Sequence, residues 1–217
     1  MKLKSLTLKH RPIFDRFLKF RPHRLAVYAF ENIYIWRGIF EIYWLLIKGH
    51  LCIFFRDKMG WFLYLPPLAK KLAPEAVFCA WEMMEELNRD NSVSRIENIE
   101  EDDLAFFKDL GFIVKSKSYD YLCSTQEIVE LKGNRFKSKR SCFNYFVKNY
   151  SYEYIPFSLK YRKDCLELYR FWMQQRKLKN KDRIYCGMLE DSFSSLKVLL
   201  DNYMDLKCTG RLVRIDR

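Results

Sequence analysis

Apolar runs in the first half of the chain predict an antiparallel meander. Residues 42–47, 51–56 and 61–65 are rich in β-branched and aromatic side chains, and the short turn segments 48–50 and 57–60 separate them. Apolar residues recur at helical spacing around this meander. The predicted helices span 12–20, 28–37, 74–88 and 100–110. Further short strands are expected at 5–8, 94–99, 112–115 and 119–123, the last two paired with each other.

The second half of the chain repeats a mixture of helices and strands. Helices are predicted at 125–131, 134–150, 159–177 and 192–206, and strands at 152–157 and 210–217. This order favours an α+β fold with a mainly antiparallel sheet flanked by helices. Because a second round of elements starts at residue 125, we expect two domains, 1–124 and 125–217.

A basic segment at 131–150 is the most informative local feature. It contains six cations and no acid: Lys132, Arg135, Lys137, Lys139, Arg140 and Lys148. On a helix, Lys137, Arg140, Ser141, Asn144 and Lys148 share one face, and Phe136, Phe143, Val147 and Tyr150 share another. The pattern predicts an apolar face that packs into a core and a cationic face that binds phosphate groups. The alternative is a solvated basic helix without a ligand, since runs of charge are usually solvated faces.

The charge of the whole chain supports a polyanionic partner. The formal net charge is +12, and the excess is concentrated near the N-terminus and in residues 160–183. Nucleic acid, an anionic membrane surface and a phosphorylated substrate all fit this charge.

Cysteine and histidine spacing predicts no metal site and no disulfide framework. Seven cysteines occur without a CxxC pair, and the three histidines do not combine with them at zinc-ligand spacing. Reduced thiols in a cytoplasmic protein are expected. Cys142 has no histidine base nearby in sequence, so it is a poor candidate nucleophile. The sequence contains no GxGxxG or P-loop motif, so nucleotide hydrolysis is not predicted. No cofactor is expected.

Membrane insertion is not predicted. No signal peptide is visible, and charged residues interrupt the most apolar region at 33–55. We expect a cytoplasmic protein, with peripheral contact with a membrane left open.

Two motifs give the chain a family resemblance. The segment YAFENIYIWR ends at Arg37, and a second motif runs from Asp120 through Gly133 and Lys139-Arg140 to Asn144 and Phe146. Both resemble segments of soluble bacterial proteins related to the C-terminal domain of phosphatidylglycerol lysyltransferase. The resemblance covers nearly the whole chain. It implies a tandem GNAT-like fold similar to the Fem-type transferases, which move an amino acid from aminoacyl-tRNA to an acceptor.

The resemblance also implies site residues and partners. Lys139, Arg140 and Asn144 occupy motif positions that would lie near the phosphate-rich donor or acceptor, and Gly133 and Phe136 occupy turn and packing positions. Together with Lys137 and Arg37, these cations and amide are the expected substrate-binding residues, although Arg37 could instead pair with a carboxylate at the end of the sheet. The partner would be aminoacyl-tRNA or a phospholipid headgroup. Ser141 departs from the family pattern, where asparagine often follows Lys-Arg.

Length is the larger departure from the family. Its members continue past the hairpin at 214–217, so we expect the second GNAT-like unit to be incomplete through truncation. A minimal variant that completes its sheet as a homodimer is the alternative.

The sequence therefore supports three hypotheses of function. The first is an aminoacyl-tRNA-dependent acyltransferase, either active or a remnant. The second is a non-catalytic binding module for tRNA or anionic lipid surfaces, and the third is an inert product without a stable fold. Transfer from an activated ester needs positioning and oxyanion stabilisation rather than a covalent nucleophile, so no catalytic residue stands out.

Overall fold

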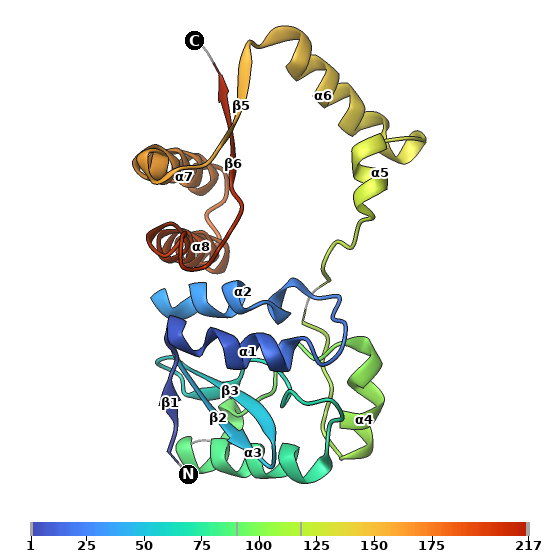
Figure 1. The fold of residues 1–217 in the computed structure, drawn as a ribbon, viewed down its shortest axis with the longest axis vertical. Helices are drawn as coiled ribbons and strands as arrows, with labels where there is room; N and C mark the ends of the chain where they lie inside the picture. Colours follow the sequence, from blue (N-terminus) through green and yellow to red (C-terminus); the bar gives the residue numbers. More distant parts are fainter. Residues whose placement is uncertain (1, 90, 118, 216–217) are drawn as a thin grey trace.

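A computed structural model describes residues 2–89, 91–117 and 119–215 (Figure 1). The fold is α+β, as predicted, and its larger sheet is antiparallel with the strand order β1-β2-β3-β4. The strands are β1 (Lys4–Ser5), β2 (Glu41–Ile47), β3 (His50–Arg56) and β4 (Trp61–Leu63). The predicted meander is thus confirmed, and its β2–β3 turn is closed by Lys48 and Gly49, which both have positive φ.

Helices cover both faces of this sheet, as Figure 1 shows. The helices α1 (Arg11–Leu18) and α2 (Phe30–Tyr34) lie on one side, and α3 (Pro74–Leu87) lies on the other. Strand β3 is consequently buried along its whole length except for Arg56. A strand that is covered on both faces has apolar residues at successive positions, and the sequence Leu51-Cys-Ile-Phe-Phe55 is such a run.

Two predicted strand regions of the first half form no regular strand. Residue Ile96 makes a single parallel bridge to Leu63, in place of the predicted strand 94–99. The expected pair 112–115 and 119–123 is wrong: the described residues there are irregular, and Ile113, Tyr119, Tyr121 and Leu122 are exposed. Their apolar side chains have no neighbouring strand or helix to cover them. The segment instead links α4 (Leu104–Asp109) to the second half of the chain (Figure 1).

The second half contains four helices and a two-stranded sheet among its described residues. The elements are α5 (Thr125–Glu130), α6 (Lys137–Asn149), β5 (Tyr152–Pro156), α7 (Arg162–Lys179), α8 (Arg183–Asp201) and β6 (Arg211–Ile215). Strands β5 and β6 pair antiparallel. The last predicted strand residues, Asp216 and Arg217, lie outside the described part of the chain.

Helix α8 starts at Arg183, earlier than the predicted Ser192. The carboxylate of Asp182 accepts a 2.7 Å hydrogen bond from the backbone N–H of Tyr185 and caps the helix. Helices α7 and α8 then pack as an antiparallel hairpin, in which the Tyr169 hydroxyl donates to the carbonyl of Leu189 at 3.2 Å.

Short 3₁₀ segments connect several of these elements. They are η1 (Leu8–His10), η2 (Ala26–Tyr28), η3 (Ile35–Gly38), η4 (Asn91–Val93), η5 (Glu101–Asp103), η6 (Asn134–Phe136) and η7 (Leu159–Tyr161). Segments η2, α2 and η3 together occupy the predicted helix 28–37.

Two clusters of buried side chains hold the chain together. The larger cluster surrounds the four-stranded sheet, and the smaller one joins Phe157, Leu166 and Leu200. Helix α8 contacts both, because its Val198 and Leu199 pack against the larger cluster and its Leu200 belongs to the smaller one. Leu206, just beyond α8, is fully buried in the larger cluster. Gly38 of η3 lies so close to α8 that a Cβ there would come within 3.0 Å of Val198. No helix among the described residues is both long and apolar enough to cross a membrane.

Candidate binding site on the α5–α6 arm

The α5–α6 arm, residues 125–149, is built around a tight turn. Leu131 and Gly133 both have positive φ, and the backbone of Gly133 (φ 84°, ψ 172°) lies in a region that glycine alone adopts readily. The Arg140 guanidinium donates to the carbonyl of Gly133 at 2.8 Å and also to the carbonyl of Leu131. Phe136 is buried at the turn. The turn and packing positions of the second motif therefore have a direct physical role.

Two exposed lysines on α6 carry unpaired charge. The structure shows no hydrogen bond or ion pair from Lys137 or Lys139 to any described residue, and Asn144 is likewise exposed. By contrast, Arg135 pairs with Glu127, and Lys132 pairs with Glu130 at 3.0 Å. Since Arg140 is already bound to backbone carbonyls, Lys137 and Lys139 are the predicted site cations on α6 that remain available to an anion.

The predicted apolar face of α6 does not pack into a core. Phe136 is buried, but Phe143, Val147 and Tyr150 are 57%, 43% and 43% exposed. Helix α6 lies apart from the four-stranded sheet, as Figure 1 shows, and the ring contacts of Tyr150 are with Tyr145 and Phe146 of the same helix. This part of the prediction is wrong because amphipathic spacing identifies an apolar face but not a partner for it.

Aromatic rings gather instead where α6 meets β5. Phe146 stacks on Tyr150 with ring centroids 5.3 Å apart, and it lies 5.2 Å from the ring of Tyr152. Beside these rings is a shallow, open depression of about 530 Å³. Its lining residues are Ser141, Cys142, Tyr145, Phe146 and Tyr150. The thiol of Cys142 is exposed there.

Arg37 makes no described contact with the predicted site residues on α6. It lies on η3, where its exposed guanidinium donates to the Tyr34 hydroxyl and sits 5.0 Å from the centre of that ring. The described contacts include no carboxylate partner for Arg37 and no contact between Arg37 and α6.

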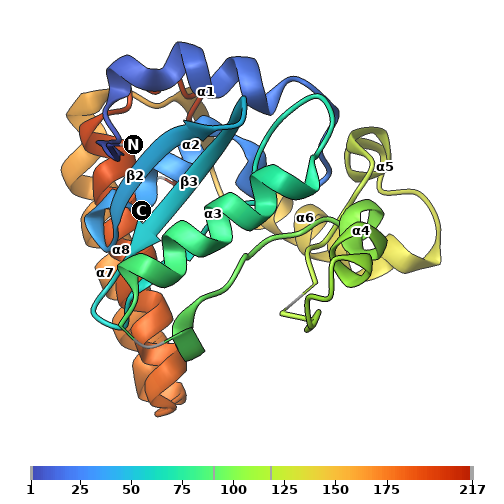
Figure 2. The same ribbon diagram turned by 90° about the horizontal axis from the view of Figure 1, so that it is seen from below.

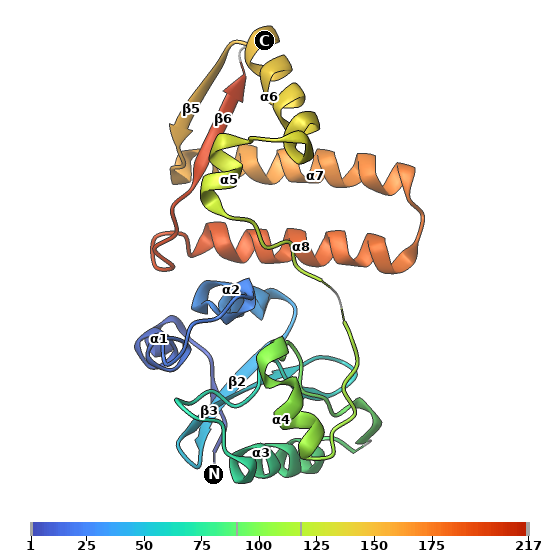
Figure 3. The ribbon, with the colours of Figure 1, turned by 90° about the vertical axis from the view of Figure 1, so that its right-hand side faces the viewer.

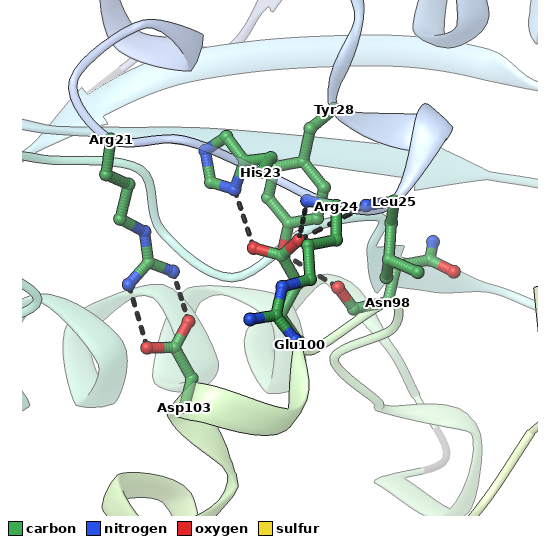
Figure 4. Close-up of polar contacts among 8 residues, drawn as sticks. All are labelled: Arg21, His23, Arg24, Leu25, Tyr28, Asn98, Glu100 and Asp103. Carbon is green, nitrogen blue, oxygen red and sulfur yellow. Dashed lines mark hydrogen bonds and ion pairs between the residues drawn. The ribbon is translucent and has the colours of Figure 1, made fainter. Parts of the chain in front are cut away.

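A buried polar network that sequence patterns did not indicate lies in the first half (Figure 4). The His23 ring nitrogen Nδ1 is 2.7 Å from the Glu100 carboxylate, and the other Glu100 oxygen accepts from the backbone N–H groups of Arg24 and Leu25. The ring of His23 also stacks on Tyr28 at 3.9 Å. No local motif could have identified this network, because His23 and Glu100 are far apart in the sequence.

The network is better explained as a structural clasp than as an active site. Arg21 forms a two-bond ion pair with Asp103, and the Tyr28 hydroxyl donates to the carbonyl of Asn98 at 2.8 Å. These contacts tie residues 21–28 to residues 98–103. The Nε2 atom of His23 is buried without a described partner, so it presents no group to solvent.

Burial and hydrogen bonding act in opposite directions on Glu100. Burial raises the pKa of this carboxyl group, but hydrogen bonds from His23 and from two backbone N–H groups outweigh it, and the pKa is lowered. Burial, the largest effect on Tyr28, raises the pKa of its phenol. The clasp therefore contains an ionised carboxylate and a neutral phenol near neutral pH.

Within the described residues, no three His, Cys, Asp or Glu side chains lie close enough to hold a metal ion. All seven cysteines are free thiols.

The comparisons with known proteins agree with the fold and with the family resemblance. The profile of the family described as "Phosphatidylglycerol lysyltransferase, C-terminal" matches residues 19–211. A crystal structure of a conserved protein of unknown function from Bacteroides thetaiotaomicron superimposes with a TM-score of 0.82 at 19% identity, over 100% of this chain and 72% of that one. No curated protein matches this chain. Because the family profile spans most of the sequence, the chain belongs to the phosphatidylglycerol lysyltransferase C-terminal domain family.

Proposed function

We propose that this chain is an aminoacyl-tRNA-dependent acyltransferase whose α6 helix contacts the phosphates of its partner. The observation that carries the proposal is the pair of exposed, unpaired cations Lys137 and Lys139, which follow a turn fixed by Arg140. Membership of the lysyltransferase C-terminal family supplies the reaction class. Aminoacyl-tRNA and a phospholipid headgroup both offer the phosphate oxygens that such cations bind.

The residues of the arm would have different roles. Lys137 and Lys139 would contact phosphate, and the amide of Asn144 would add a hydrogen bond. Arg140 would act as a positioning residue, because its guanidinium is held by the carbonyls of Leu131 and Gly133. Arg37 would contribute only with a partner long enough to reach both η3 and α6.

The chemistry asked of the protein is modest. An aminoacyl ester is already activated, so the protein has to place the acceptor nucleophile near the ester carbonyl and stabilise the oxyanion that forms. This scheme needs neither a metal nor a covalent intermediate.

A non-catalytic binding module for tRNA or anionic lipid is the second candidate. Its support is the open depression beside α6, whose lining combines aromatic rings with the hydroxyls of Ser141, Tyr145 and Tyr150 and the thiol of Cys142. Such a surface suits binding, since nucleic-acid bases stack on exposed aromatic rings and the cations Lys137 and Lys139 lie on the same helix.

One experiment separates the two candidates. The protein is incubated with aminoacyl-tRNA labelled on the amino acid, with phospholipid vesicles and peptides as acceptors. Product that forms only when both tRNA and protein are present supports the transferase. Binding of the tRNA without transfer to any acceptor supports the module.

Lys139→Glu is the informative variant in this assay, with Lys58→Glu on the β3–β4 turn as its charge-matched control. Both lysines are exposed, so neither change should affect the fold. Arg140→Glu is less informative, because it would also break the turn.

We also propose the division into units 1–124 and 125–217, each GNAT-like and related by duplication. The exposed linker and the two separate buried clusters support the division, although Leu206 returns to the first cluster. A cytoplasmic setting is consistent with the free thiols. The uncovered apolar face of α6 leaves room for a homodimer, which sedimentation would detect.

A further inference from the structure

The α7–α8 hairpin ends in a projecting tip, which we define as residues 176–188. Helices of 18 and 19 residues are about 27 Å long at a rise of roughly 1.5 Å per residue. Their near ends carry the smaller buried cluster and the contact with η3, whereas their far ends extend beyond the first sheet and its helices (Figures 2 and 3).

Large aliphatic side chains are exposed at this tip. Leu178 is 72% exposed, Ile184 is 77% exposed and Met188 is 61% exposed. They come from the last turn of α7 and the first turns of α8, so they lie at one end of the hairpin. Large aliphatic side chains that are left exposed at one end of a hairpin are typical of an interaction surface.

Cations lie between these aliphatic side chains in the sequence. Lys179, Lys181 and Arg183 are exposed, and none of them pairs with a described acid. Asp182 is the one acid within residues 176–188, and its carboxylate caps α8, while Glu190 beyond the tip pairs with Lys177. The tip is therefore both apolar and strongly positive.

Internal hydrogen bonds hold the loop of the tip in place before any partner binds. The Asn180 side chain accepts from the backbone N–H of Asp182 at 2.9 Å, and the Cys186 thiol donates to the carbonyl of Asn180 at 3.4 Å. A preformed tip loses little conformational entropy when it binds.

From this arrangement we propose that the α7–α8 tip docks on an anionic lipid bilayer. Leu178, Ile184 and Met188 enter the boundary between headgroups and acyl chains, while Lys179, Lys181 and Arg183 contact the lipid phosphates. The aliphatic character decides between a bilayer and RNA. Leucine, isoleucine and methionine offer no aromatic face on which a base can stack. This inference uses residues outside the α6 arm and stands independently of the proposed transfer activity.

Co-sedimentation with vesicles tests the docking. The probes are vesicles of phosphatidylcholine alone and of phosphatidylcholine mixed with phosphatidylglycerol, with the full chain as ligand. We expect binding to the mixed vesicles only. The triple variant Leu178→Ser, Ile184→Ser, Met188→Ser should bind at least about tenfold more weakly. Replacing Lys179, Lys181 and Arg183 by serine should weaken binding about fivefold per cation at low salt.

The matched control is the double variant Lys58→Ser, Met59→Ser. It removes an exposed cation and a 74% exposed apolar side chain from the β3–β4 turn, and it should leave vesicle binding unchanged. All changed side chains are exposed, and unaltered circular dichroism and thermal unfolding would show that each variant folds.

A second readout reports insertion directly. In an Ile184→Trp variant, the added fluorescence should shift to shorter wavelength and be quenched by brominated lipid, and in a Met59→Trp variant it should do neither. The proposal is overturned if the tip variants bind vesicles as well as the wild type does. It is also overturned if the wild type does not bind vesicles and substitution of the tip cations instead weakens its binding to RNA.

Discussion

The Arg140 guanidinium donates a 2.8 Å hydrogen bond to the carbonyl of Gly133 and so closes the turn that starts α6. This contact explains why a glycine and an arginine occur together in the second motif. The arginine reaches back over the first turn of its own helix, and the glycine supplies a backbone conformation that other residues avoid.

Removing the arginine should loosen the arm without unfolding the rest of the chain. Arg140→Ala deletes two charge-assisted hydrogen bonds at a partly exposed position, a loss of about 1–2 kcal/mol. Hydrogen exchange of the α6 amides should then be about tenfold faster, while exchange in β3 stays the same. Lys139→Ala is the control, because that neighbour has no described partner; if its effect equals that of Arg140→Ala, the contact does not hold the arm.

A side chain at the turn glycine should have a similar local effect. An added Cβ at Gly133 meets no atom within 4 Å, so any cost of Gly133→Ala comes from the backbone conformation alone, at roughly 1–3 kcal/mol. The α6 amides should again exchange faster. Gly187→Ala within α8 is the matched control and should slow exchange there slightly, because that glycine lacks a positive φ and alanine favours helix. Unchanged α6 exchange in Gly133→Ala would refute the strained turn.

The Glu100 clasp should make stability depend on pH. Because the pKa of Glu100 is lowered in the folded chain, its contribution is present above the usual glutamate value of 4.5 and is lost as pH falls through the folded value. Glu100→Gln should reduce the free energy of unfolding by about 1–3 kcal/mol near neutral pH. Urea unfolding of both proteins should show this difference shrinking in acid, and a constant difference across that range would count against the clasp.

A second contact joins the two ends of the chain. The guanidinium of Arg11 donates to the carbonyl of Leu206 at 2.8 Å and pairs with Glu31 and, at 3.3 Å, with Asp15. Arg11→Ala should therefore lower the free energy of unfolding by about 2 kcal/mol, because it leaves two part-buried carboxylates unpaired. Arg16→Ala, on the same helix but exposed, should change it by less than about 0.5 kcal/mol in the same urea titration. Equal effects of the two substitutions would show that Arg11 does not join the ends.

Sequence patterns correctly predicted the helices, strands and turns whose formation depends on residues close together in the sequence. The meander from Glu41 to Leu63 follows from β-branched and aromatic runs with turn residues between them, and α3 follows from helical spacing after Pro74. Gly111 follows the end of α4, has positive φ and donates to the carbonyl of Lys108, as is typical of a glycine that ends a helix. In each case the residues that decide the structure lie within a few positions of one another.

The features that could not be predicted depend on contacts between segments that are distant in the sequence. The residues around Tyr119 and Tyr121 have strand-like composition, but no strand lies beside them, so they form an exposed linker. The apolar face of α6 has a clear helical period, but Phe143, Val147 and Tyr150 stay exposed. The clasp of His23 and Glu100 joins segments that are distant in sequence. Of the predicted site residues, the structure places Lys137, Lys139, Arg140 and Asn144 on one helix, and their contact with a substrate stays a prediction.

The affinity of the protein for tRNA tests the central claim most directly. Fluorescence anisotropy would be recorded over a range of salt concentrations for the wild type, Lys137→Glu, Lys139→Glu and the control Lys58→Glu. We predict that binding of the wild type weakens steeply with salt. Each α6 variant should bind more weakly and with a shallower salt dependence, and the control should match the wild type. Equal affinity and salt dependence in all four proteins would contradict a phosphate-binding role for α6.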